Sequence, residues 1–424
     1  MDSQIDLQQP IVDGGIRSVN FFNGRMLTAR DLTREQAANR EVDRRLGQAI
    51  GDGISYGFEV SKSLASTNQA PVISVEPGLA VNRQGQTLRL QDRTDVALVR
   101  KASASAGGQI FGQCLPLQSG TYVAGAGVYL LTVAPAETRE GRAVTSALNT
   151  GGAPCNTDSL VSAVQFRLIQ IDPPITAAEL QDQDHLRNVI AYKCFGTTEI
   201  GSFLKNLFGP PVKTYGLLDS LRPNQLTDCD VPLGVLYWTL SDGIKFVDMW
   251  SVRRRVVGSG ADNSWLPLVS DRRRSEGEAM FLQFEEHVNS LRTTRPNPSQ
   301  LRAVEEFRYL PPVGIIPLST NGFAQGFHDD LFFDTLTLHP EVFIESSRVE
   351  AIVRAGLNYP PVDLQAPDLP VMFWIYRVRE NRQTLVAGTP QTVVQHYMIF
   401  SSGHMAFMGD PHYDVNRWNF GNYV

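Results

Sequence analysis

The C-terminal part of the chain holds the densest group of side chains that could do chemistry. Three histidines, His396, His404 and His412, lie near two carboxylates, Asp410 and Asp414. Imidazoles and carboxylates in this number could bind zinc or another divalent cation. Their spacing matches no metal motif and aromatic residues flank each of them, so structural histidines are the favoured interpretation. We therefore predict no metal and no cofactor.

A second candidate for chemistry is Ser55, because residues 53–57 read Gly-Ile-Ser-Tyr-Gly and match the G-x-S-x-G pattern of hydrolases. That pattern places its serine after a strand and before a helix. Here the predicted helix precedes the serine and a β region follows it, so Ser55 is rejected as a nucleophile. The sequence also contains no phosphate-binding loop, H-E-x-x-H pair or dinucleotide fingerprint. It therefore predicts no catalytic residue and no enzyme.

The element that organises the chain is residues 18–60, where an aromatic pair, a turn, a charged helix and a glycine-rich corner follow one another. Thr28 can cap a helix, and Asp31 stands three residues later in the capping-box position. The helix is expected from about Ala29 to Ala49. Its apolar residues form a narrow stripe, namely Leu32, Val42, Leu46 and Ile50.

The remaining faces of this helix carry arginines, among them Arg34, Arg40, Arg44 and Arg45, against a similar number of acids. One interpretation is a solvated face with ion pairs between neighbouring turns, each contributing about 0.2–0.5 kcal/mol. The other is a docking helix whose arginines pair with a neighbouring subunit. A stripe this narrow suits a helix that lies on a surface, so docking is preferred, and we include Phe21 and Phe22 in the predicted interface.

Two further segments complete the predicted interface. Arg253 and Arg254 follow an apolar strand and could bind carboxylate or phosphate, although an exposed strand end paired with an acid such as Asp248 explains them as well. The run from Leu310 to Pro317 is rich in proline, which favours an extended, unpaired or edge segment. From this proline-rich strap we predict four contact residues, namely Tyr309, Leu310, Pro311 and Pro312.

Length and composition limit the class of protein. A chain of 424 residues with 42% hydrophobic residues exceeds one ordinary core, so several domains are expected. The net charge of -6 shows no nucleic-acid footprint. No signal peptide and no apolar run of membrane-spanning length are present, so we expect synthesis and assembly in the cytoplasm. The four cysteines are far apart, and reduced, mostly buried thiols are expected.

These patterns predict a mainly β protein with a few helices (α+β). It has an N-terminal helix, a central β-meander or barrel-like region and a C-terminal β-sandwich or jelly-roll-like domain. The predicted parts are an arm and docking helix at 1–57, a central β-rich domain at 58–260, a helical connector at 261–309 and a C-terminal β domain at 310–424. The central domain is expected to contain a long loop at 135–160 and a helix near 177–193.

Local patterns place the strands. Residues 72–98 alternate between apolar and polar with turns at Pro77-Gly78 and Gln84-Gly85, which predicts a meander with two hairpins. Another hairpin is predicted across Ser241-Asp242-Gly243. In the last domain, strands are expected around 343–354, 371–379 and 392–400.

A family resemblance rests on four segments taken together. Residues 21–60 combine Phe-Phe-Asn-Gly, an arginine-rich helix and a glycine-rich corner, and residues 75–90 read V-x-P-G-x-A-x-x-x-x-G-x-x-L-x-L. Residues 248–254 read Asp-x-Trp-x-Val-Arg-Arg, and residues 307–314 read Phe-x-Tyr-Leu-Pro-Pro-x-Gly. In this combination the chain resembles a family of structural proteins associated with phage-tail-like contractile injection systems.

The resemblance implies a non-catalytic component at or near the baseplate or spike, whose partners are other subunits of the particle in an oligomeric assembly. The lack of a long apolar run predicts no direct membrane span, and the particle is expected to be one that is released or membrane-anchored. Two alternatives stay open. The C-terminal domain could bind a surface glycan or receptor through Trp374, Tyr376 and Trp418, as a tail-fibre-like module does. A cell-wall hydrolase is the third alternative, for which the sequence holds no motif.

Overall fold

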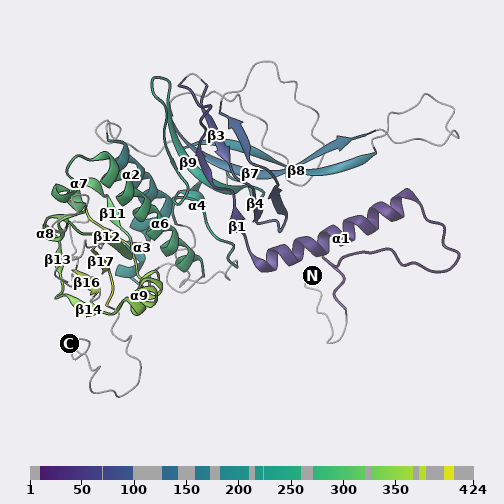
Figure 1. Cartoon of the computed structure of the whole chain (residues 1–424). Helices are drawn as coiled ribbons and strands as arrows, with labels where there is room; N and C mark the ends of the chain where they lie inside the picture. Colours follow the sequence, from purple (N-terminus) through teal and green to yellow (C-terminus); the bar gives the residue numbers. More distant parts are fainter. Residues whose placement is uncertain are drawn as a thin grey trace, which may run out of the picture.

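The computed structural model describes residues 10–68, 70–98, 127–141, 158–171, 182–209, 215–222, 224–258, 271–319, 326–365, 372–378 and 396–404. Within them the chain is a mixed α+β protein in which strands outnumber helices. Figure 1 shows a projecting N-terminal helix, a β-rich middle and a helix-covered C-terminal part, in that order from one side of the molecule to the other. No helix of the described residues is long and apolar enough to cross a membrane.

Helix α1 (Ala29–Ile50) forms where the capping box predicts it. The Thr28 hydroxyl accepts a hydrogen bond from the Asp31 N–H at 3.2 Å, and the Asp31 carboxylate accepts one from the Thr28 N–H at 3.1 Å. The helix ends at Gly51, whose φ of 113° excludes a side chain. A Cβ atom on Gly51 would lie 1.9 Å from the Val257 carbonyl oxygen. The helix therefore stops against the β-rich middle of the chain.

Six short strands follow α1 and form two three-stranded antiparallel sheets, in the orders β1-β4-β5 and β2-β3-β6. They are β1 (Gly53–Gly57), β2 (Val60–Lys62), β3 (Val72–Val75), β4 (Gly78–Val81), β5 (Thr87–Leu90) and β6 (Thr94–Ala97). The predicted β4–β5 hairpin is confirmed. The predicted hairpin at Pro77-Gly78 is wrong, because β3 pairs with β2 and β6 instead of β4.

A corner with left-handed backbone explains why consecutive strands lie in different sheets. Gly57 and Phe58 both have positive φ, at 67° and 57°, and they carry the chain from β1 in one sheet to β2 in the other. Gly78 packs directly on this corner, since a Cβ atom there would lie 2.4 Å from the Phe58 nitrogen. The Pro77-Gly78 turn therefore makes the same change of sheet, from β3 to β4.

The central sheet has four antiparallel strands in the order β10-β9-β7-β8. They are β7 (Gly127–Glu140), β8 (Ser159–Ile171), β9 (Val231–Thr239) and β10 (Gly243–Asp248). The predicted hairpin across Ser241-Asp242-Gly243 is confirmed. The predicted loop at 135–160 is too long, because β7 continues through Glu140 in register with Ser159 of β8. None of these sheets closes, so the barrel-like prediction is wrong for the described residues.

The central sheet is covered on both faces. One face shares a core with the two small sheets, which includes Phe58, Ile73, Leu131 and Trp238. The other face packs against α2 (Gln183–Phe195) and α4 (Leu217–Leu221) through residues such as Leu186 and Leu218. Helix α2 is capped by Asp182 and overlaps the helix predicted near 177–193, of which residues 177–181 lie outside the described residues. A short helix, α3 (Thr197–Lys205), follows it.

In the residues that the structure describes, the C-terminal part holds a five-stranded mixed sheet with helices on both faces, an arrangement that differs from the predicted sandwich or jelly roll. Its order is β12-β17-β16-β13, with β14 also parallel to β16. The strands are β12 (Val313–Pro317), β13 (Thr337–Leu338), β14 (Val342–Ile344), β16 (Met372–Val378) and β17 (Tyr397–Ser401), and a separate pair is formed by β11 (Tyr309–Leu310) and β15 (Val362–Asp363). The remaining helices are α6 (Asp271–Thr294), α7 (Ala303–Glu306), α8 (Asp329–Phe332) and α9 (Val349–Gly356).

Helix α6 belongs to the C-terminal core. Its Phe284, Val288 and Leu291 are buried against the sheet, as their spacing predicts. Helix α9 covers the opposite face through Ile352. Helix α6 also contacts α2 of the preceding part of the chain. The predicted domain boundaries at 57, 260 and 309 stay predictions.

Candidate functional site

The most exposed apolar surface of the described residues lies on and beside α1. Of the 17 large apolar side chains that are exposed, 10 lie between Ile11 and Ile50. The four residues of the predicted stripe are 44–62% exposed. Phe21 and Phe22, in the segment before α1, are exposed as well, and Figure 1 draws α1 as a helix that projects from the body of the protein. Contiguous exposed apolar surface of this extent is typical of a protein interface.

The N-terminal arm covers only one side of α1. The Val19 N–H donates to the Glu35 carboxylate at 2.9 Å, and Arg25 forms an ion pair with Asp31 at 2.7 Å. Arg45 donates to the Gly14 carbonyl oxygen at 2.5 Å. These contacts bury Val19 and Ala38 between the arm and the helix. The arm therefore braces the projecting helix and leaves its apolar stripe in solvent.

The predicted arginines of α1 fall into two groups. Arg44 and Arg45 pair with Glu41, at 3.8 Å and 3.2 Å. Arg34 and Arg40 are exposed and form no ion pair with any residue in the part of the chain that the structure describes. The first two are explained as intrahelical pairs, and the last two remain available to a partner.

Two glycines fasten α1 to the β-rich middle. A Cβ atom on Gly47 would lie 2.1 Å from the Gly85 carbonyl oxygen, and one on Gly85 would lie 1.9 Å from the Arg44 carbonyl oxygen. Gly85 sits in the β4–β5 turn with φ of 76°, which favours glycine on its own account. Gly85, the second glycine of the V-x-P-G-x-A-x-x-x-x-G segment, thus lets the hairpin contact the backbone of α1.

Arg253 and Arg254 are not available to a partner. Arg253 donates to the carbonyl oxygens of Gly57 and Phe58, the latter at 2.9 Å, and so fixes the left-handed corner. Arg254 donates to the Trp250 carbonyl oxygen at 3.0 Å and lies over the Phe195 ring at 4.7 Å. Burial lowers the pKa of Arg254. Both arginines were predicted to contact a partner, and the structure corrects this, because they bind groups of their own chain.

The proline-rich strap is also internal. Tyr309, Leu310, Pro311 and Pro312 are all buried, so they present no surface to a partner. β11 pairs with β15, and β12 is an edge strand paired with β17, which confirms the edge prediction and excludes an unpaired segment. The prolines donate no hydrogen bond but their rings are apolar, which suits a buried edge.

A buried polar network joins two of the resembling segments, and sequence reasoning missed it. Arg187 of α2 donates to the Asp248 carboxylate at 2.9 Å, and Gln283 of α6 approaches the same carboxylate at 3.4 Å. The Tyr309 hydroxyl donates to Gln283 at 3.2 Å. Burial opposes the charge of Arg187, but Asp248 and Glu286 outweigh it and raise the arginine pKa. Asp248, expected as a partner for the neighbouring arginines, instead ties β10 to α2 and α6.

Of the five metal candidates, only His396 and His404 lie among the described residues. The His396 carbonyl oxygen accepts from the Leu318 N–H at 2.8 Å, whereas the His404 ring stacks on Trp374 at 3.7 Å. His412 lies outside the described residues. The one ligand-type cluster among the described residues is His328, Asp329 and Asp330. Asp329 forms an ion pair with Arg377, which explains the position of this carboxylate without a metal ion.

The glycan-binding alternative loses its aromatic platform. Trp374 is stacked between His339 at 3.6 Å and His404 at 3.7 Å, so neither ring face is open to a sugar. Tyr376 is buried at 3% exposure, and Trp418 lies outside the described residues. Ser55 lies within β1, on an exposed strand position and not on a strand-to-helix turn, which agrees with its rejection as a nucleophile.

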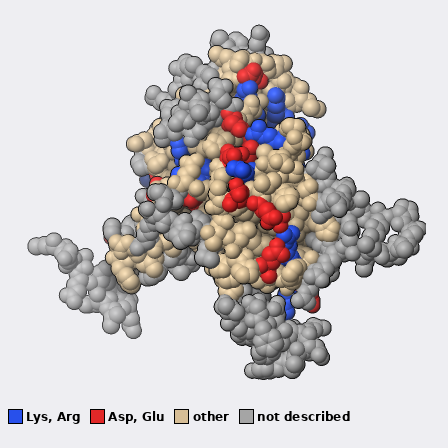
Figure 2. Space-filling view, turned by 90° about the vertical axis from the view of Figure 1, so that its left-hand side faces the viewer, with Lys and Arg blue, Asp and Glu red and all other residues tan. Residues whose placement is uncertain are grey.

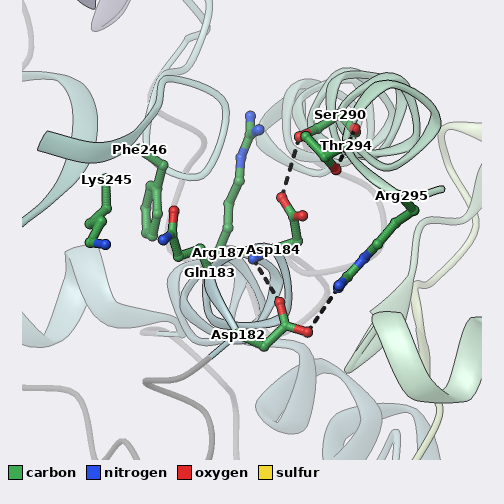
Figure 3. Close-up of a pocket in the computed structure, with 9 residues that line it drawn as sticks. All are labelled: Asp182, Gln183, Asp184, Arg187, Lys245, Phe246, Ser290, Thr294 and Arg295. Atoms are coloured by element: carbon green, nitrogen blue, oxygen red, sulfur yellow. Dashed lines mark hydrogen bonds and ion pairs between the residues drawn. The ribbon is translucent and has the colours of Figure 1, made fainter. Parts of the chain in front are cut away.

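A polar pocket of about 470 Å³ lies where α2 begins and α6 ends. Figure 3 shows side chains from the start of α2, from β10 and from the end of α6 around it. Asp182 accepts from Arg295 at 2.9 Å and caps α2 by accepting from the His185 N–H at 3.2 Å. Asp184 accepts from Ser290 at 3.3 Å. The pocket is therefore lined by groups that already bind one another.

The two carboxylates of this pocket titrate differently. Burial raises the pKa of Asp184. Burial acts in the same direction on Asp182, but the Arg295 guanidinium and two backbone N–H groups lower its pKa overall. Opposed shifts can mark an acid–base pair. Here Asp182 is committed to the helix cap and to Arg295, so the pair is explained as a polar seam between α2 and α6.

Two cysteines and the surface charges are further features of the described residues. Cys194 is free and buried, and burial raises the pKa of its thiol to about 12. Cys229 is disulfide-bonded, which corrects the reduced-thiol prediction for it. Figure 2 shows Asp and Glu side chains through the middle of the face opposite α1 with Lys and Arg beside them, so the described surface of that face carries both signs of charge.

Comparison with known proteins adds no family. Neither a scan against protein-family models nor a search of curated proteins matched this chain. The strongest candidate site is therefore the one that geometry defines, a protein interface on the projecting helix α1 and the aromatic pair before it.

Proposed function

We propose that this chain is a non-catalytic structural component of a phage-tail-like contractile injection particle, at or near its baseplate or spike, and that it assembles through α1. The observation that carries the proposal is the exposed apolar stripe on a helix that projects from the body of the protein. Surface of this kind is stable in solution only where a partner covers it or where solvation of its flanks is strong. The flanking Arg34 and Arg40 add charge for which the described residues offer no ion-pair partner.

The resembling segments support the same proposal, because in this chain they are structural junctions. The glycines of residues 51–57 and 75–90 fit the helix end, the corner and the hairpin together. Asp248 and Tyr309 meet in one buried network. Such junctions hold a scaffold rigid and bring no reactive group into a cleft. This role is the one expected of an assembly subunit, with α1 as its attachment point and without the proline-rich strap.

The test is incorporation of a truncated chain into particles. Deleting residues 1–50 removes α1 and its arm but leaves the core that begins at Ile54. The truncated chain is expected to fold and to be absent from particles purified after co-expression with sheath, tube and baseplate subunits. The full chain should co-purify with them. Normal incorporation of the folded truncation would refute assembly through α1, and absence of the full chain would refute the proposed function.

A further inference from the structure

The exposed residues of α1 form a heptad pattern that the four-residue stripe only partly shows. Leu32, Asn39 and Leu46 are spaced seven residues apart, as are Glu35, Val42 and Ala49. Every one of these except Glu35 is exposed. Four of the six are apolar, namely Leu32, Val42, Leu46 and Ala49. Heptad spacing of apolar residues is typical of helices that pair with helices, the two sets occupying the a and d positions. The pattern therefore indicates a helix as the occupant of the stripe.

Asn39 indicates which helix. It stands at the middle a position, exposed, and its side chain makes no hydrogen bond with any of the described residues. A single asparagine at an a position specifies register and a two-stranded state, because it pairs with an identical asparagine across the seam. A second copy of this chain supplies that asparagine by symmetry when the two helices run parallel. In an antiparallel pair, a positions face d positions and Asn39 would meet Val42.

The charges of α1 are compatible with a like-with-like pair. Arg30, Arg34 and Arg40 occupy the outer positions f, c and b of the heptad, so they point away from a seam formed by a and d. Glu35 is the one acidic residue at a core position, where a parallel pair sets it opposite Glu35 of the second copy. The Val19 N–H of its own arm donates to this carboxylate at 2.9 Å and offsets part of that repulsion. The parallel pairing therefore sets no arginine of one copy against an arginine of the other.

The available area matches what a stable dimer needs. Eight large apolar side chains from Phe21 to Ile50 are exposed, of which Leu32, Val42 and Leu46 lie in the seam and the others lie elsewhere on α1 or in the segment before it. At roughly 100 Å² each, the eight together present on the order of 800 Å² per copy, of which the seam supplies about 300 Å² and the flanking residues supply the rest. A stable interface buries about 800 Å² per partner, whereas the largest apolar patch of a typical monomer is about 300–600 Å².

We propose that two copies of this chain associate through a parallel, in-register coiled coil of their α1 helices, with Leu32, Asn39, Val42 and Leu46 in the seam. The segments before α1 that carry Phe21 and Phe22 then lie beside each other, and both bodies lie at the Gly47 end. The inference rests on the proposed function only in taking α1 as an interface. It names the partner as a second copy and the geometry as parallel.

Sedimentation equilibrium of the full chain tests the pairing. We expect a mass near twice the chain's 46.9 kDa at micromolar concentration. Leu46→Asp places a charge in the seam and should weaken association at least tenfold. Ala37→Asp is the matched control, because it adds the same charge at an exposed outer position of the same helix. A monomeric wild-type chain at about 100 µM, or equal behaviour of the two variants, would overturn the proposal.

A cysteine pair tests the orientation. Under mild oxidation, Asn39→Cys should give a covalent dimer on a non-reducing gel, because identical a positions of a parallel pair lie within disulfide reach. Ala37→Cys should not. Cross-linking at 37 and not at 39 would overturn the parallel seam. A monomeric chain that still enters particles would refute the dimer alone, and a dimer that never enters particles would refute the proposed function alone.

Discussion

Replacing Asp248 with alanine is expected to lower the free energy of unfolding far more than the loss of a solvent-exposed carboxylate would. The substitution removes the carboxylate that Arg187 of α2 binds at 2.9 Å and that also accepts from the Ser251 N–H at 3.1 Å. Arg187 is only 7% exposed, so its charge is left inside the protein with one remaining partner, Glu286, at 2.7 Å. The change therefore affects the junction between β10, α2 and α6.

The magnitude follows from the burial of the two carboxylates. Asp248 is 1% exposed, and removing one partner of a buried ion pair costs about 3–5 kcal/mol. Because Glu286 continues to neutralise part of the charge, we expect the lower end, about 3 kcal/mol of unfolding free energy. Glu286 itself is 42% exposed, and its replacement by alanine should cost at most about 1 kcal/mol.

The assay is urea unfolding of the full chain followed by tryptophan fluorescence, with Trp238 buried in the same half of the molecule. Asp248→Ala and Glu286→Ala remove a carboxylate from the same arginine, so each serves as the control for the other. A cost for Asp248→Ala no larger than that for Glu286→Ala would refute the claim that this network holds the two halves together.

Three further predictions concern the helix anchor, one buried acid and the corner. Gly85→Ala should destabilise the protein by more than the roughly 1 kcal/mol expected for Gly24→Ala, because both have positive φ but only the Gly85 side chain would meet the Arg44 carbonyl oxygen. Thermal unfolding and hydrogen exchange of α1 measure the difference, and equal effects would contradict the anchor. Burial raises the pKa of Glu285 to about 7, so the folded state holds a proton that the unfolded chain releases near 4.5, and stability should fall as pH rises between these values. Glu285→Gln should remove this dependence and be more stable at pH 8 by at most about 3 kcal/mol, whereas parallel pH profiles of the two proteins would speak against it. Arg253→Lys should destabilise the corner at Gly57 and Phe58, since an ammonium cannot reproduce the two-carbonyl contact of the guanidinium, and unchanged urea unfolding would exclude that role.

The helix α1 could be predicted from sequence because its signals are local. Thr28 and Asp31 are three residues apart, and the exposed stripe follows from residue types and spacing alone. The hairpin at Gly243 and the buried stripe of α6 are local in the same sense. The docking interpretation of α1 was drawn from the narrowness of that stripe, and its exposure agrees with it.

The wrong predictions concern segments whose conformation or burial depends on residues far away in the sequence. Residues 349–356 read Val-Glu-Ala-Ile-Val-Arg-Ala-Gly, which is too short a segment to separate a strand from a helix by its pattern. They form α9, whose Ile352 packs in one core with Val313 and Ile399 of the sheet. Pro311 and Pro312 suggest a strap that contacts a partner, yet both are buried between the β11–β15 pair and the β12–β17 pair, where the Ser402 N–H donates to the Pro312 carbonyl oxygen at 2.9 Å. An arginine such as Arg253 is usually exposed, and only the fold shows that its guanidinium donates to backbone carbonyl oxygens of the Gly57–Phe58 corner.

The most direct test of the account is how much of each α1 variant enters assembled particles. Leu46→Asp changes the exposed stripe, whereas Ala37→Asp adds the same charge to another exposed face of the same helix. Quantitative mass spectrometry of purified particles should find Ala37→Asp at the wild-type level and Leu46→Asp reduced at least tenfold, with both soluble proteins equally folded. Equal incorporation of the two variants would contradict the claim that the stripe of α1 attaches this protein to its assembly.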